Sequence, residues 1–174
     1  AAERAFAWLE TRRPQAFPGP VDRAQAAKGA VVYDRACSSC HGVYSGPVDR
    51  PHLERFPNWH GHVGSDPARA AAFTDDLTRY AANGGYDKVL DARPTGEYAA
   101  TLLSGLWATA PYMHNGVMPE LSGVVTFYNA GGARPRPRED QKDDPHFPQT
   151  DPLLAPLNLT AEEREALVAF LETL

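Results

Sequence analysis

Apolar residues recur at helical spacing in separate stretches of the chain, and segments rich in proline and glycine lie between them. The clearest stretch closes the sequence, where Thr160 and Glu163 have the spacing of a capping box at a helix N-terminus. The apolar stripe of that helix consists of Leu167, Phe170, Leu171 and Leu174. No segment alternates with the period of two that is typical of a strand, so the pattern predicts an all-α protein.

A second helix is predicted over residues 23–36, with Asp22 as its N-cap. Its apolar positions are Ala26, Val31, Val32 and Tyr33. The sequence also predicts a short helix over residues 3–12. That helix is expected to pack through its apolar side chains, which are Phe6, Trp8 and Leu9.

Three further helices are predicted, the first and the last of them from proline near the start and glycine after the end. They cover residues from about 67 to 82, 97 to 107 and 119 to 129. The first follows Asp66-Pro67 and stops at Asn83-Gly84-Gly85, and the last starts at Pro119 and is closed by Gly131-Gly132. A loop is expected over residues 42–65. Residues 133–157 contain six prolines, so we expect a long loop without regular structure there as well.

The 174 residues suffice for one domain with a core, which we place at residues 21–174 after an N-terminal extension over residues 1–20. A hydrophobic fraction of 43% is ordinary for a soluble protein, and no apolar run has the length of a membrane span. The net charge of −5 argues against nucleic acid as a partner. An acidic surface would suit a basic redox partner protein.

The chain's only two cysteines lie in Cys37-Ser38-Ser39-Cys40-His41, which has the Cys-x-x-Cys-His spacing of covalent haem c attachment. Each thiol can form a thioether to one vinyl group of the haem, and the adjacent imidazole can then bind the iron as the proximal ligand. A zinc site would need a second pair of Cys or His ligands, and no further cysteine exists. A redox dithiol of the thioredoxin type would follow a strand in a βαβ pattern, and no such pattern precedes the motif. A solvent-exposed dithiol remains the alternative.

One covalent haem c implies a cellular location, because this haem is attached outside the cytoplasm in bacteria. The chain opens with Ala1-Ala2-Glu3-Arg4 and shows no secretory signal. We therefore expect a periplasmic protein whose signal peptide has been removed.

The order of the predicted helices fits a class I c-type cytochrome, a helical fold around the haem with long Pro- and Gly-rich loops. In that fold an N-terminal helix leads into the haem motif, and a C-terminal helix crosses it. Gly29, four residues before Tyr33, would let the helix that carries Phe170 approach closely.

A second set of residues resembles a narrower family. The segment Ala110-Pro111-Tyr112-Met113-His114-Asn115-Gly116, followed by Phe127-Tyr128-Asn129 and by the closing helix, resembles the C-terminal haem domain of bacterial di-haem cytochrome c peroxidases and MauG-like enzymes. The resemblance covers about residues 25–174. It implies that Cys37 and Cys40 hold the haem and that His41 is the proximal ligand.

The chain departs from this family in one respect: the family carries two haems, and this sequence has one Cys-x-x-Cys-His motif. The C-terminal haem of the family is the electron-transfer centre. The resemblance therefore implies electron transfer and does not by itself imply peroxidase activity.

Several residues compete as the distal ligand of the iron. Tyr128 lies fourteen residues after His114, where the resembling peroxidases have a methionine ligand and MauG-like proteins have a tyrosine ligand. Met113 and Met118 are the alternatives, because a thioether is the usual distal ligand of electron-transfer cytochromes. Each of these side chains would also suit ordinary core packing.

Histidines offer further alternatives. His60, His62 or His114 would give a bis-histidine haem, and an open sixth position would permit reaction with peroxide or small ligands. The resemblance places His114 near the haem, where it would hydrogen-bond a propionate or the distal ligand, and the alternative is a buried histidine that bonds to the backbone.

The leading hypothesis is a periplasmic mono-haem cytochrome c that transfers single electrons to and from redox partner proteins. The alternative is a peroxidase-like or MauG-like haem enzyme, acting alone or beside a second haem protein. A third hypothesis is a module that binds small gases.

Overall fold

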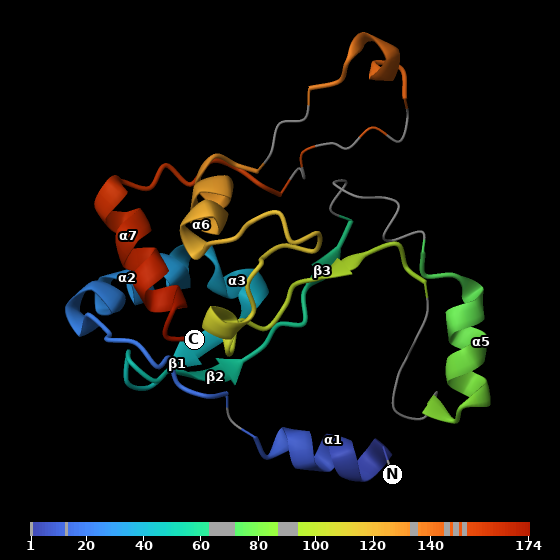
Figure 1. Cartoon of the computed structure of the whole chain (residues 1–174), viewed down its shortest axis with the longest axis horizontal. Helices are drawn as coiled ribbons and strands as arrows, with labels where there is room; N and C mark the ends of the chain where they lie inside the picture. The colour runs from blue at the N-terminus through green and yellow to red at the C-terminus, as the bar shows by residue number, and fades with distance from the viewer. Residues whose placement is uncertain are drawn as a thin grey trace. The chain divides into compact units, whose positions relative to one another are not determined.

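The computed structural model describes residues 2–12, 14–62, 72–86, 94–132, 136–144, 147, 150 and 153–174 (Figure 1). They belong to two compact units. The first consists of Ala1–Pro57, Leu102–Val125 and Leu159–Leu174, and the second of Asn58–Thr101 and Thr126–Asn158. Across the described ranges, helices dominate and four short strands accompany them, so the fold is mostly helical and not strictly all-α as predicted. None of the helices in these ranges is long and apolar enough to cross a membrane.

The core of the first unit is the contact between α2 (Arg23–Ala36) and α7 (Ala161–Leu171), which lie against each other in Figure 1. The contact is close at Gly29, where a Cβ atom would lie 1.9 Å from the carbonyl oxygen of Ala166 and 2.8 Å from Cβ of Phe170. The close approach predicted from Gly29 is therefore confirmed. The helices bury Ala26, Gly29, Val32 and Tyr33 of α2, and Ala166, Leu167, Phe170 and Leu171 of α7.

Val31 is the one apolar position named for the predicted helix over residues 23–36 that is exposed. Its side chain is 66% exposed, whereas Val32 is buried. Successive helical residues are rotated by about 100° around the axis. One step along α2 therefore takes the side chain off the face that contacts α7, and Val31 is exposed although it is apolar.

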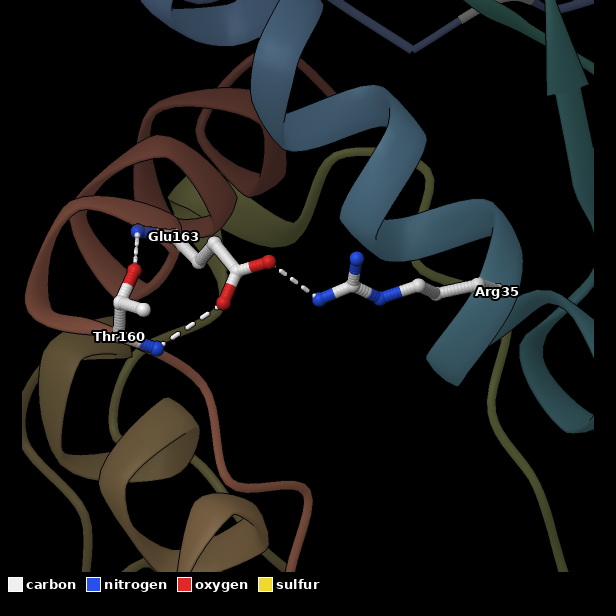
Figure 2. Close-up of polar contacts among 3 residues, drawn as sticks. All are labelled: Arg35, Thr160 and Glu163. Atoms are coloured by element: carbon white, nitrogen blue, oxygen red, sulfur yellow. Dashed lines mark hydrogen bonds and ion pairs between the residues drawn. The ribbon is translucent and has the colours of Figure 1, made fainter.

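The ends of α2 and α7 are capped as the sequence predicted. The Asp22 carboxylate accepts the backbone N–H groups of Ala24 and Gln25 at 3.0 Å each. At the start of α7, Thr160 N–H donates to Glu163 Oε2 at 2.9 Å, and Glu163 N–H donates to Thr160 Oγ1 at 3.1 Å (Figure 2).

The Glu163 carboxylate also joins the two helices. Its other oxygen pairs with the Arg35 guanidinium near the end of α2 (Figure 2). The Thr160 backbone N–H, and then the Arg35 guanidinium, hold the pKa of Glu163 below its usual value. The ion pair thus links the start of α7 to the last turn of α2, immediately before Cys37.

Two small antiparallel pairs of strands lie where the sequence predicted loops or a helix. In the first unit β1 (Val43–Ser45) pairs with β2 (His52–Arg55), and in the second unit β3 (His60–Gly61) pairs with β4 (Tyr98–Ala99). The predicted helix over residues 97–107 is therefore wrong. Its start pairs in a strand, and only the 3₁₀ helix η2 (Leu106–Ala108) follows after Gly105, which has a φ of +78°.

The short N-terminal helix is confirmed as α1 (Ala2–Glu10), but its packing is not. Phe6, Trp8 and Leu9 remain exposed. The Trp8 ring is contacted by the Arg12 guanidinium, 4.2 Å from the ring centroid, so the residue that covers it comes from the chain just after the helix and not from a core.

The helix predicted over about 67–82 is observed as α5 (Asp75–Asn83), which ends at the predicted glycines and begins after Thr74. The predicted start at Asp66-Pro67 lies outside the described residues. Within the predicted irregular loop over 133–157, the described part includes one 3₁₀ helix, η3 (Glu139–Gln141).

The helix predicted from Pro119 is α6 (Leu121–Asn129), and Gly131-Gly132 ends it as expected. Gly131 N–H donates to the Tyr128 carbonyl at 3.0 Å, and Gly132 N–H donates to the Phe127 carbonyl at 2.9 Å. This is the Schellman pattern, and Gly131 supplies the positive φ of +77° that it requires.

Candidate functional site

The Cys-x-x-Cys-His motif forms one turn of helix directly after α2. Cys37 ends α2 and its N–H donates to the Tyr33 carbonyl at 2.8 Å, after which α3 covers Ser38–His41. The N–H groups of Cys40 and His41 both donate to the Cys37 carbonyl, at 3.2 and 2.9 Å. Residues three apart in such a turn lie on one side of it. The turn therefore presents two thiols on one side, with the imidazole on the next residue.

Both thiols are free and half-buried. Burial, and secondly the neighbouring Cys40, raise the pKa of the Cys37 thiol to about 11. Redox-active dithiols show the opposite shift, because their attacking cysteine is activated by a lowered pKa. The environment of Cys37 thus disfavours the redox dithiol.

In the part of the chain that the structure describes, no three His, Cys, Asp or Glu side chains are grouped so as to hold a metal ion. The donor set of the motif, two thiols and one imidazole on a single turn, instead matches what covalent attachment of haem c requires.

A buried tyrosine of α2, Tyr33, hydrogen-bonds to the backbone at the end of this turn. The Tyr33 hydroxyl donates to the carbonyl oxygen of Gly42, the residue after His41, at 2.8 Å. The Tyr33 ring contacts Phe170 of α7 with centroids 5.3 Å apart and meets Tyr44 of β1 edge to face at 5.8 Å. Burial, aided by Tyr44, raises the pKa of Tyr33 far above its ordinary value, so the hydroxyl stays protonated and can donate.

A second tyrosine, Tyr44, connects β1 to the segment that precedes Met113, the first of the candidate distal ligands in this unit. The Tyr44 hydroxyl accepts the N–H of Leu103 at 3.0 Å and lies 3.3 Å from Ser104 Oγ. Gly105 N–H donates to the carbonyl of the C-terminal Leu174 at 2.6 Å. The strand after the motif, this segment and the end of the chain are therefore connected within the first unit.

The methionines and His114 lie in this first unit with the motif. Tyr112 and Met118 pair through their backbones, with Tyr112 N–H donating to the Met118 carbonyl at 2.7 Å. Met113 occupies the turn between them with a positive φ of +70°. The side chains of Met113, His114 and Met118 are half-buried.

Tyr128 lies on the last turns of α6, in the second unit. Its ring is half-buried and meets the Phe127 ring edge to face with centroids 5.5 Å apart. The structure thus groups Cys37, Cys40, His41, Met113, His114 and Met118 in one unit and places Tyr128 in the other.

The remaining histidine candidates belong to an exposed strand pair. His60 Nδ1 lies 2.7 Å from Glu97 Oε2, and His62 Nδ1 lies 3.2 Å from the Gly96 carbonyl. Both side chains are exposed, and each has its partner within the second unit. This arrangement indicates that His60 and His62 are surface residues and argues against a role as iron ligands.

The sequence pattern predicts neither the hydrogen bond of the Tyr33 hydroxyl at the motif nor the hydrogen bonds of the Tyr44 hydroxyl away from it. Tyr33 is one of the apolar positions of the helix predicted over residues 23–36, and Tyr44 lies in the loop expected over residues 42–65. Their partners depend on the turn at Gly42 and on the fold of residues 102–105, which no local pattern encodes. The one sequence signal is a tyrosine in place of a purely apolar residue on the buried face of α2, since a buried hydroxyl usually has a hydrogen-bond partner.

Comparison with known proteins gives matches over most of the chain. A family model of cytochrome c oxidase, cbb3-type, subunit III, matches residues 24–96, and a RoxA-like, cytochrome c-like family model matches residues 96–131. The cytochrome-c peroxidase IdrP2 of Pseudomonas sp. (strain SCT) is 34% identical over 147 residues, which are 79% of this chain and 35% of that protein. The methylamine utilization protein MauG of Paracoccus denitrificans (strain Pd 1222) is 32% identical over 160 residues, which are 79% of this chain and 38% of that protein.

A solved structure shares the fold. The crystal structure of a MauG-like protein associated with microbial copper homeostasis superimposes with a TM-score of 0.50 at 24% identity, over 86% of this chain and 46% of that one. The chain spans little more than a third of the length of the curated relatives named above.

Proposed function

The chain belongs to the MauG-like family of di-haem cytochrome c peroxidases, and on this premise we propose that it is a haem c domain that transfers single electrons. Haem c, when bound, supplies the one-electron couple. Cys37 and Cys40 hold it covalently, and His41 is the proximal ligand. The observation that carries the proposal is the single helical turn that presents both free thiols and the imidazole at the end of α2.

The protein's part in this function is to hold the haem in place and to shield it from solvent. The core between α2 and α7 anchors the motif turn, and the ion pair between Arg35 and Glu163 joins the two helices beside it. A rigid support keeps the reorganisation on electron transfer small, and burial of the attached group influences its potential.

For the distal side we propose Tyr128 as the iron ligand, with Met113 and Met118 as the alternatives. A phenolate stabilises the ferric state, so a tyrosine ligand gives a lower potential than a methionine. His114 is proposed to hydrogen-bond a propionate or the distal ligand.

A second candidate function is that of a peroxidase-like or MauG-like oxidoreductase, or of a part of one. It is favoured by the printed names of the relatives, which are cytochrome-c peroxidases and MauG. Because the chain spans little more than a third of these relatives, this activity belongs to the proposals. A second haem protein or domain would then complete the site.

The proposed location is the periplasm, where haem c is attached in bacteria. The proposed partners are redox proteins that donate and accept single electrons. The net charge of −5 suits a partner with a basic surface.

One set of spectra tests the proposal. We expect the purified chain to carry covalent haem by mass spectrometry, to show a low-spin ferric spectrum and to titrate as a one-electron couple. A ferric haem that neither binds cyanide nor reacts with peroxide would support electron transfer. Rapid oxidation by peroxide to a high-valent species would favour the enzyme instead, and a chain without covalent haem would refute both functions.

A further inference from the structure

Gly42, the residue after His41, is fixed by two backbone hydrogen bonds and by close packing. Gly42 N–H donates to the Ser38 carbonyl at 3.0 Å, and the Gly42 carbonyl accepts the Tyr33 hydroxyl at 2.8 Å. A Cβ atom at Gly42 would lie 2.9 Å from the carbonyl oxygen of Arg55 and 2.9 Å from Leu53 Cδ1, at a φ of +98°. Both backbone polar groups of Gly42 are thus hydrogen-bonded, and β2 packs against its Cα.

Tyr33, whose hydroxyl bonds to the Gly42 carbonyl, is itself fixed by packing. Its side chain is buried on α2, 2% exposed, between Phe170 of α7 and Tyr44 of β1. A ring packed in this way has little freedom to follow a moving partner. The hydroxyl therefore links the α2–α7 core to the backbone at the end of α3.

We propose that Tyr33 is a positioning residue: its hydrogen bond to the Gly42 carbonyl fixes the backbone of His41 and so the orientation of the imidazole on the iron. The inference rests on the proposed function, in which His41 is the proximal ligand. The Gly42 N–H belongs to the peptide that joins His41 to Gly42, so a Gly42 residue held by its hydrogen bonds to Tyr33 and Ser38 restricts the movement of that peptide and of the adjoining His41 backbone. Groups that orient a metal ligand also tune the properties of the metal.

The test is the substitution Tyr33→Phe, which keeps the ring between Phe170 and Tyr44 and removes only the hydroxyl. The matched control is Tyr44→Phe, which removes the neighbouring hydroxyl, whose contacts are Leu103 and Ser104 and not Gly42. Both variants are prepared as the haem-loaded chain. The readouts are the electron paramagnetic resonance g-values of the ferric haem, which report ligand orientation, the reduction potential and hydrogen exchange of the Gly42 N–H.

We expect Tyr33→Phe to shift and broaden the g-values, to move the reduction potential and to speed exchange at Gly42, whereas Tyr44→Phe leaves these three readouts as in the wild type. Faster exchange with unchanged g-values and potential would overturn the inference, because the hydrogen bond would then act on stability alone. Equal shifts in the two variants would also overturn it. A wild-type chain that carries no covalent haem would instead refute the proposed function, so the two failures are distinguishable.

Discussion

The contact at Gly29 makes a quantitative prediction for the substitution Gly29→Ala. The added Cβ would lie 1.9 Å from the Ala166 carbonyl oxygen, 2.5 Å from its carbonyl carbon and 2.8 Å from Phe170 Cβ. An ordinary contact begins at 3.4 Å, so the two helices must separate by more than an ångström at this point. The nearest atoms are backbone atoms, so a change of rotamer cannot relieve the clash.

The cost follows from two opposing effects. Overpacking a core costs about 1–3 kcal/mol, and a clash with backbone belongs at the upper end of that range. Alanine is a better helix former than glycine by about 1 kcal/mol, which offsets part of the cost. We therefore expect a net loss of about 2 kcal/mol, which lowers the melting temperature of a chain of this size by about 4–8 °C.

Gly123→Ala is the matched control, because it makes the same chemical change inside α6. There the nearest atom to the added Cβ is Met118 Sδ at 3.4 Å, the end of a flexible side chain. Thermal unfolding of the haem-loaded variants, followed by far-ultraviolet circular dichroism, should show a lower melting temperature for Gly29→Ala. Gly123→Ala should show an unchanged or slightly higher melting temperature, because the better helix propensity of alanine meets no clash there. A Gly29→Ala chain that melts at or above the wild-type temperature would contradict the close packing of α2 on α7.

The site supports four further predictions. Cys40→Ala removes one thioether, and mass spectrometry should show less covalent haem than in the wild type. In a chain prepared without haem, Cys37 should react with an alkylating reagent at pH 8 about a hundredfold more slowly when folded than in urea, because burial raises its pKa from 9.0 to about 11. Glu163→Gln should lower the urea midpoint at neutral pH. The lowered pKa of Glu163 gives stability that is present above its unfolded pKa and lost as the pH falls through its folded pKa. The urea midpoints of the variant and of the wild type should therefore converge at acidic pH. Tyr128→Phe should convert the ferric haem toward high spin and admit cyanide, and an unchanged spectrum there, with the change in Met118→Leu or Met113→Leu, would move the ligand to a methionine.

Helices whose ends carry local signals could be predicted from the sequence. The capping interactions of Asp22 and of Thr160 with Glu163 join residues within three positions of each other. The Schellman pattern at Gly131 is equally local. Such signals depend on no distant contact, and α2, α6 and α7 accordingly lie close to where the pattern placed them.

The strands were missed because they are too short for a period of two to emerge. β3 and β4 have two residues each, and their pairing joins His60 to Ala99 and Gly61 to Tyr98. The apolar residues that follow Tyr98 have helical spacing, yet Ala100 N–H donates to the Trp59 carbonyl at 2.9 Å. A bond to a distant segment outweighs a weak local preference there.

The same distinction between local and distant contacts divides the candidate site. Two thiols three residues apart and an imidazole on the next residue need only one helical turn to come together, so the spacing of the motif was sufficient to place them. The group that supports this turn, the Tyr33 hydroxyl, depends on the reversal of the chain at Gly42 and on the packing of α7, and neither appears in the spacing. A distal ligand must come from still farther along the chain, from the Met113 to Met118 turn or from Tyr128 of α6. Its choice is a property of tertiary packing, and this is why the spectrum of Tyr128→Phe carries more information than any further reading of the motif.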